Sequence, residues 1–267
     1  MRDLIDNEGV GEFFEVPGLR EYLRQAAGGA PAGQEGGLFE EAAGPAPTDL
    51  TALAPPELRR ISLYAYNAAA LAAMSEPLPA ESIRRFCRKL LSAAERAGGG
   101  PGGQPARRAA DAAAGDRADS DTRTVLEAAA KVTREIDRLR GLLRFCPDRA
   151  GMYVARCAPD HFVLPALAGH FETRFGGTPW AVIDEKRGLV LAEFPGERPR
   201  LAGPRAFAEA AALPGETARG EPGRWEELWR TYHRSVSNKD RENPGLQRQF
   251  MPKRYWKYLT EMQAPSP

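Results

Sequence analysis

The carboxy-terminal stretch NPGLQRQFMPKRYWKYL, residues 243–259, combines aromatic and cationic side chains at close spacing. Aromatic rings stack on unpaired bases, each contributing about 1–3 kcal/mol to binding, while cations neutralise phosphates. If an α-helix begins at Pro252, then Tyr255, Leu259 and Met262 share one face. The remaining side chains would form a nucleic-acid surface: Lys253, Arg254, Trp256, Lys257 and Tyr258. The same pattern is typical of an amphipathic helix that closes a hydrophobic core, so both interpretations stay open.

A second group of cations lies near the end of a long predicted helix, in TREIDRLRGLLRF at residues 133–145. Arg134 and Arg138 are four residues apart, as are Arg140 and Arg144, so each pair forms a ridge of planar donors that can clamp phosphate oxygens. Cations at the carboxyl end of a helix also complement its dipole, and this simpler role fits equally well. Three further cations complete the predicted nucleic-acid-binding set: Arg156, Arg174 and Arg230.

Histidines and a carboxylate are the candidates for catalysis. In APDHFVLP, Asp160 precedes His161, and a carboxylate that fixes an imidazole tautomer makes a general base. The simpler interpretation is that Asp160 caps a helix and that His161 packs or bonds to the backbone. His170 is the third candidate, because with Arg174 it would hold charge that develops in a transition state.

The sequence argues against a metal site. In an unbroken helix from Asp160, His161 and His170 lie nine residues apart on opposite faces and cannot share an ion. A helix that begins at Pro165 instead leaves His161 in the preceding loop. The chain also lacks a P-loop, a nucleophile elbow and a glycine-rich dinucleotide turn.

The three cysteines fit neither a disulfide framework nor a CxxC motif, and they are too widely spaced to bind an iron–sulfur cluster by themselves. We expect buried free thiols, and we expect no metal and no cofactor held by this chain. The residues concerned are Cys87, Cys146 and Cys157.

The charge and hydropathy of the chain limit the classes of partner that it can bind. The 267-residue chain has 37 Lys or Arg and 36 Asp or Glu, a formal net charge of +1. Because this charge creates no global attraction to a polyanion, a nucleic-acid partner must meet a local patch. No apolar run approaches the roughly 20 residues that span a bilayer, and the amino terminus lacks the order of a signal peptide. We therefore expect a soluble, cytoplasmic protein without a membrane partner.

The predicted helices and strands that position these residues fall into two regions, one in each half of the chain. Helical spacing of apolar residues predicts helices over 55–74 and 80–94, after a loop-rich start. A further apolar stripe runs from Val125 to Leu143, with Asp121 or Thr122 as its N-cap. The predicted domains are a helical region over 1–96, a Gly/Pro-rich flexible linker over 97–121 and a domain over 122–262.

The last domain mixes helices and strands. MYVARCA alternates as a strand, and WAVIDEKRGLVLAEF reads as two strands joined by a turn at 185–188. Helical spacing returns before Phe175 and again after Pro222, where Trp225, Tyr232 and Val236 line one face together with Leu228 or Trp229. A Pro/Gly-rich insertion is predicted over 195–223. We therefore predict an α+β protein, mainly helical, with a small antiparallel sheet in the carboxy-terminal domain.

Three blocks taken together resemble a bacterial family described as DNA metabolism or DNA repair proteins: REIDRLRGLLRF, MYVARCAPDHFVLPALAGHFETRFGGTPWAVIDEKRG and WEELWRTYHRSVSNKDRENPGLQRQFMPKRYWKYL. The resemblance covers residues 122–260. Members are typically encoded beside a radical-SAM protein similar to spore photoproduct lyase, and related domains are fused to a uracil-DNA glycosylase domain. The amino-terminal strand usual in the family is not recognisable in residues 1–25. The resemblance implies a role in DNA repair but assigns no chemistry to individual residues.

Three hypotheses follow. In the first, the protein binds damaged or single-stranded DNA and supports a radical-SAM partner enzyme. In the second, it is itself a DNA-processing hydrolase, such as a nuclease or a glycosylase-like enzyme, in which His161 is the acid or base and Asp160 orients it. In the third, it is an adaptor whose aromatic surface docks the radical-SAM protein.

Overall fold

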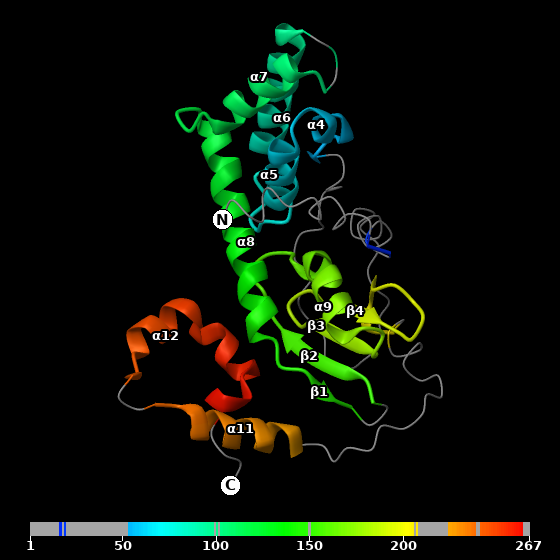
Figure 1. The fold of residues 1–267 in the computed structure, drawn as a ribbon, viewed down its shortest axis with the longest axis vertical. Coiled ribbons are helices and arrows are strands. Elements are labelled where there is room, and N and C mark those ends of the chain that lie inside the picture. Colours follow the sequence, from blue (N-terminus) through cyan, green and yellow to red (C-terminus); the bar gives the residue numbers. More distant parts are fainter. Residues whose placement is uncertain are drawn as a thin grey trace, which may run out of the picture. The chain divides into compact units, whose positions relative to one another are not determined.

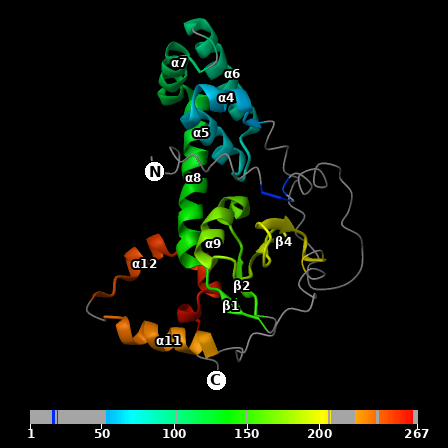
Figure 2. The same ribbon diagram turned by 45° about the vertical axis from the view of Figure 1, so that its right-hand side comes forward.

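The computed structural model describes residues 16–17, 19, 53–98, 100, 102–148, 151–205, 207, 224–238 and 241–263. Their contacts divide the chain into two compact units. Among the described residues, unit 1 contains 16–17, 19, those from 53 to 136 and 160–166, and unit 2 contains 137–159 together with those from 167 to 263. Figure 1 and Figure 2 label the main helices and strands.

Unit 1 is built from helices. Ser62 separates the first two, because it is extended and its hydroxyl accepts a hydrogen bond of 3.1 Å from the amide of Ala65, which caps the second helix. The helix predicted over 55–74 is therefore two helices. The helices of unit 1 are α4 (Pro56–Ile61), α5 (Leu63–Ala73), α6 (Ala80–Ala97), α7 (Gln104–Gly115) and most of α8 (Ser120–Leu142).

Helix α7 occupies the segment predicted as a flexible linker, so that prediction is wrong for residues 104–115. Alanine has the highest helix propensity, and Ala106, Ala110 and Ala114 recur every four residues and are buried. Ala106 and Ala110 form a buried cluster with Ile61 and Ala94, and α6 and α7 lie side by side in both views (Figure 1, Figure 2). The proposed division of the whole chain into three domains stays a prediction.

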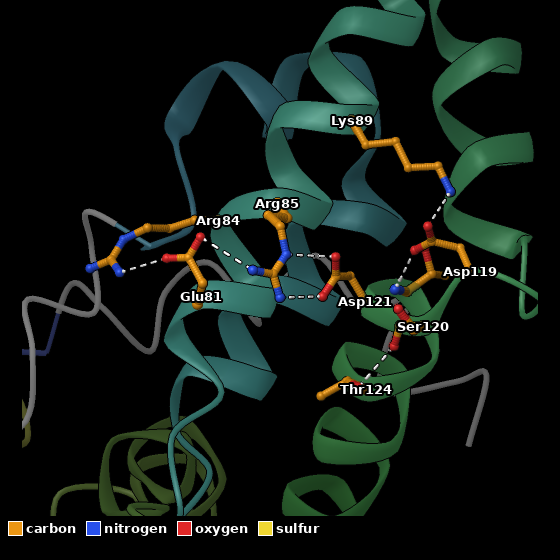
Figure 3. Close-up of polar contacts among 9 residues, drawn as sticks. Glu81, Arg84, Arg85, Lys89, Asp119, Ser120, Asp121 and Thr124 are labelled. Atoms are coloured by element: carbon orange, nitrogen blue, oxygen red, sulfur yellow. Dashed lines mark hydrogen bonds and ion pairs between the residues drawn. The ribbon is translucent and has the colours of Figure 1, made fainter.

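Ion pairs connect α6 to the start of α8, as Figure 3 shows. Arg85 donates to both carboxylate oxygens of Asp121, at 2.8 and 2.9 Å, and Lys89 lies 3.2 Å from Asp119. Asp119 also accepts a 2.8 Å hydrogen bond from the amide of Thr122. Asp119, rather than the predicted Asp121 or Thr122, therefore caps α8.

Helix α8 carries the predicted apolar stripe except for Leu143, which follows the last residue of the helix and is only partly buried. Four residues of the stripe are fully buried, namely Val125, Ala129, Val132 and Ile136, and Leu139 is only 1% exposed. Its spacing of alternately four and three residues places these side chains on one face. No described helix is long and apolar enough to cross a membrane.

Unit 2 contains a five-stranded sheet in the order β1-β2-β3-β4-β5. Neighbouring strands are antiparallel except for β2 and β3, which are parallel. The α+β class is confirmed, but the sheet is mixed because the connection from β2 to β3 carries the 3-10 turn η2 (Leu164–Leu167) and α9 (Ala168–Phe175). The strands are β1 (Cys146–Pro147), β2 (Tyr153–Cys157), β3 (Trp180–Asp184), β4 (Leu189–Glu193) and β5 (Arg200–Ala202).

The turn between β3 and β4 lies where it was predicted. The carboxylate of Asp184 accepts hydrogen bonds from the amides of Lys186 and Arg187, and Gly188 takes the left-handed conformation with a φ of 60°. Strand β5 falls inside the predicted insertion over 195–223, so that segment is not wholly an insertion. It was missed because three residues are too few for a periodic pattern.

The core of unit 2 lies between the sheet and α9. Phe171 of α9 contacts the fully buried Trp180 of β3, with ring centroids 5.6 Å apart. The indole N–H of Trp180 donates a 2.6 Å hydrogen bond to Glu193, and burial raises the pKa of that carboxyl group. Two of the free cysteines, Cys87 in unit 1 and Cys157 in unit 2, are buried as predicted, whereas Cys146 is only partly buried. Burial raises the pKa of the Cys87 thiol to about 12.

Residues 224–263, here called the C-terminal segment, do not end in the predicted α-helix. The chain instead forms 3-10 turns after Pro252, which is why the hydrogen bonds from Tyr255 and Leu259 reach back three residues. Tyr255 and Leu259 are nevertheless buried as predicted, at 2% and 0% exposure. The elements are α11 (Arg224–Val236), α12 (Pro244–Phe250), η4 (Lys253–Tyr258) and η5 (Thr260–Met262).

Candidate nucleic-acid interface

The C-terminal segment exposes large apolar side chains. Tyr232 and Val236 are each 57% exposed and Phe250 is 63% exposed, so two side chains of the apolar face predicted for α11 lie largely in solvent. Burying such side chains is favourable, which makes their exposure informative. Among the described residues, the exposed large apolar side chains are all in α11 and α12: Leu228, Trp229, Tyr232, Val236, Leu246 and Phe250.

The same segment is basic. It contains nine Lys or Arg and five Asp or Glu, which gives a net charge of +4 in a chain whose net charge is +1. Lys253 is exposed and lies 5.9 Å above the ring of Trp256, and it forms no ion pair with another described residue. Arg248, also exposed, donates among the described residues only to the carbonyl oxygen of Pro244, at 3.1 Å. The segment therefore combines free positive charge with exposed rings.

Glu261 joins α11 to the rest of unit 2. Its side chain is 3% exposed and accepts hydrogen bonds from Arg144, at 2.6 Å, and from the indole N–H of Trp229, at 2.8 Å. The guanidinium of Arg144 also lies 5.1 Å from the centre of the Trp229 ring. Burial raises the pKa of Glu261, but the hydrogen bond and charge of Arg144 outweigh this effect and hold the pKa below its ordinary value. Arg144 thus stabilises the fold, and its role in binding stays a prediction.

A second carboxylate, Glu185, brings three predicted binding residues together. The hydroxyl of Tyr258 donates to it at 2.6 Å, and Lys257 and Arg156 each lie 3.5 Å away. Burial and the neighbouring carboxylate raise the pKa of Tyr258. Because one carboxylate faces two cations, this group keeps a local charge of +1. Arg156 and Lys257 are thereby fixed in position but only partly neutralised.

The other predicted binding residues differ in how far their side chains are already engaged in contacts within the protein. Arg230 donates to the carbonyl oxygen of Thr260, at 3.2 Å, and Arg254 lies over the ring of Tyr255, at 4.7 Å. The indole N–H of Trp256 donates to the carbonyl oxygen of Met251, at 2.8 Å. Since Lys253 already covers this ring, Trp256 is less available for stacking than the sequence suggested.

Three predicted residues form a basic cluster beside α9. His170 and Arg174 lie one helical turn apart, and Arg140 stands close enough for its charge to affect His170. Burial, followed by the charges of Arg140 and Arg174, lowers the pKa of His170. The Nε2 atom of His170 and the Nε atom of Arg140 are buried and have no hydrogen-bond partner among the described residues. The surroundings of His170 therefore disfavour its protonated form.

The other catalytic candidates, Asp160 and His161, lie in unit 1. Their backbone amides donate to the buried carboxylate of Glu135, at 2.9 and 2.7 Å. The Nδ1 atom of His161 accepts a 3.0 Å hydrogen bond from the amide of Glu76, which places the ring proton on Nε2. The backbone, rather than Asp160, therefore fixes the tautomer at Nδ1. In this state His161 can donate a proton from Nε2 but cannot accept one at Nδ1.

No three His, Cys, Asp or Glu side chains in the described part of the chain are grouped so that they could hold a metal ion. Residues 104–261 match the family described as Domain of unknown function (DUF4130). This match covers more than half of the 267-residue chain. The chain belongs to the DUF4130 family. A comparison with curated proteins and one with solved structures gave no match.

The DUF4130 region begins at Gln104, the first residue of α7, and so includes a helix that the resemblance over 122–260 did not cover. Sequence reasoning also missed Tyr232 and Phe250 as surface residues. The sequence did contain a signal for these surface residues, because apolar residues and arginines alternate in α11 and α12. A pattern of this kind does not show whether its apolar side has anything to pack against.

Proposed function

We propose that this DUF4130 protein acts in DNA repair, binding damaged or single-stranded DNA through its C-terminal segment and supporting a radical-SAM partner enzyme. The resemblance to DNA repair proteins is the source of the repair role and of the partner. One observation carries the DNA-binding part of the proposal. The exposed rings of α11 and α12 share a segment of net charge +4 with Arg248 and Lys253, which have no acidic partner among the described residues.

Rings and cations contribute different parts of such binding. Each base stacked on an aromatic ring adds about 1–3 kcal/mol, and each neutralised phosphate of a single strand adds about 0.7 to the salt dependence of binding. Tyr232 and Phe250 are the rings best placed to stack on bases, since both are more than half exposed. Because the net charge of the whole chain is only +1, binding depends on this segment and weakens steeply with salt.

The proposal is tested by fluorescence anisotropy with a labelled single-stranded oligonucleotide. The double variant Tyr232→Ala/Phe250→Ala should weaken binding at least about tenfold, since it removes two stacking rings. Circular dichroism should show an unchanged fold, because both side chains are exposed. Leu246→Ala is a matched control that removes an exposed aliphatic side chain of α12 and should leave affinity within about twofold. Equal affinity of the double variant and the wild type would overturn the assignment.

The adaptor function has a specific observation in its favour. Leu228, Val236 and Leu246 are aliphatic and exposed, and aliphatic surface is buried more readily against a protein than against nucleic acid. Co-purification with the radical-SAM protein and no retention on single-stranded DNA would favour this second function over the first. Loss of co-purification in Leu228→Ala/Val236→Ala, with DNA binding retained, would show that the segment does both.

A further inference from the structure

A cavity of about 350 Å³ lies against one face of α8 in unit 1. It is here called the basic groove. Leu126 and Ala130, each 8% exposed, contribute apolar surface, and Glu127 is the one carboxylate among the described lining residues. Four cations line it: Arg117, Arg123, Lys131 and Arg134.

The cations of the groove are unneutralised. No side chain of the four forms a hydrogen bond or an ion pair with another described residue, in contrast to the neighbouring cations Arg84, Arg85 and Lys89 of α6 (Figure 3). The acidic residues of the turn before α8 and of its first turn face α6, so they do not offset the charge of the groove. With one carboxylate against four cations, the groove has a local charge of +3.

Helix geometry arranges these charges in a row. At 100° per residue, Arg123 and Arg134 differ by only about 20° in direction, and they are separated by about 16 Å along the axis. Lys131 lies between them along the axis, about 12 Å from Arg123, but its direction differs from that of Arg123 by about 80°. The buried stripe of Val125 and Val132 lies on the opposite side of the helix.

From this row, the charge and the apolar surface, we infer that the basic groove binds the phosphodiester backbone of a nucleic-acid strand over two or three consecutive phosphates. A row of separate cations suits a chain of phosphates better than a single anion, which one or two arginines would satisfy. Leu126 and Ala130 give the sugars or bases an apolar surface to contact. The inference shares its ligand class with the proposed function but rests on unit 1 alone.

The test uses the full chain and a ten-nucleotide thymidine oligonucleotide, with thymidine monophosphate and inorganic phosphate as competitors. Arg123→Gln/Arg134→Gln should weaken oligonucleotide binding about tenfold, and Glu127→Gln should strengthen it about threefold. Arg84→Gln is the matched control, because it removes a cation of the same unit that is already paired with Glu81, and it should leave affinity unchanged. An increase with Glu127→Gln is not expected from damage to the fold.

The two sites can fail separately. Weaker binding in the groove variant, with no effect of Tyr232→Ala/Phe250→Ala, would support the groove and overturn the C-terminal assignment. The reverse result would overturn the groove. Competition by thymidine monophosphate or by inorganic phosphate at concentrations close to those of the oligonucleotide would also overturn the inference, because the site would then hold a single small anion.

Discussion

The cations of α6 and those of the basic groove belong to the same unit but have different surroundings. Arg84, Arg85 and Lys89 each form an ion pair with at least one carboxylate, whereas Arg123 and Arg134 form none with a described residue, although Glu127 lines the same groove. Composition cannot separate the two sets, since both are arginines and lysines on amphipathic helices. Asp119 and Asp121 form ion pairs with the cations of α6 and not with those of the groove. The positive charge of the groove therefore remains available to a partner.

Unit 2 repeats this contrast. Arg144 is paired with Glu261, and Arg156 and Lys257 share Glu185, whereas Lys253 has no acidic partner in the described part of the chain. Paired and free cations should therefore respond differently to substitution. Removing a paired cation, or its partner, should affect stability, and removing a free one should affect binding.

The largest expected effect is on the buried pair of unit 2. Glu261→Ala leaves Arg144 without its partner and frees the indole N–H of Trp229, so the free energy of unfolding should fall by about 3 kcal/mol. Chemical denaturation followed by tryptophan fluorescence measures it. Glu227→Ala, in an exposed part of α11, is the matched control and should change stability by less than about 0.5 kcal/mol. Equal effects of the two substitutions would contradict the structural role of Glu261.

A smaller effect is expected at the surface pair of unit 1, and it should depend on pH. The hydrogen bond from Arg85 is the main cause that lowers the pKa of Asp121 to about 2. A carboxyl group with a depressed pKa stabilises the fold above its unfolded value of 3.8, and this contribution is lost as the pH falls towards 2. The melting temperature of Asp121→Asn should thus lie slightly below that of the wild type at pH 6 and converge with it near pH 2. A difference that grows on acidification would contradict this.

The smallest expected effect concerns His170. Its pKa lies below 6.5 because of burial, with further contributions from Arg140 and Arg174. Between pH 6.5 and the lower folded value the unfolded chain binds the extra proton, so the stability of the protein falls as the pH decreases through this range. In an NMR titration, Arg174→Gln should raise the pKa of His170 towards 6.5, and an unchanged or lower value would contradict the coupling.

Local patterns explain what the sequence predicted well. The stripe from Val125 to Leu139 and the turn that follows Asp184 depend on residues close in the chain, and both are present as predicted. The parallel pairing of β2 with β3 was missed because it depends on a connection of more than twenty residues. Helix α7 was missed because an alanine-rich segment resembles a linker until it has another helix to pack against.

The candidate site was predictable in composition but not in arrangement. The sequence placed cations and aromatic residues between 253 and 258, and the structure brings Lys257 and Tyr258 to Glu185. No local pattern indicated that Glu185, more than seventy residues earlier, is their partner. Nor did any indicate that the amide of Glu76 holds the ring of His161, because both contacts arise only when distant segments fold together.

The salt dependence of single-stranded DNA binding tests the central claim most directly. We predict that the logarithm of the association constant falls linearly with the logarithm of the salt concentration, and that Arg248→Gln/Lys253→Gln reduces the slope by about 1.4, since each phosphate on a single strand contributes about 0.7. Arg144→Gln should instead lower stability. A slope that is the same in the wild type and in Arg248→Gln/Lys253→Gln, or affinity that does not change with salt, would contradict the claim that free cations of the C-terminal segment hold the strand.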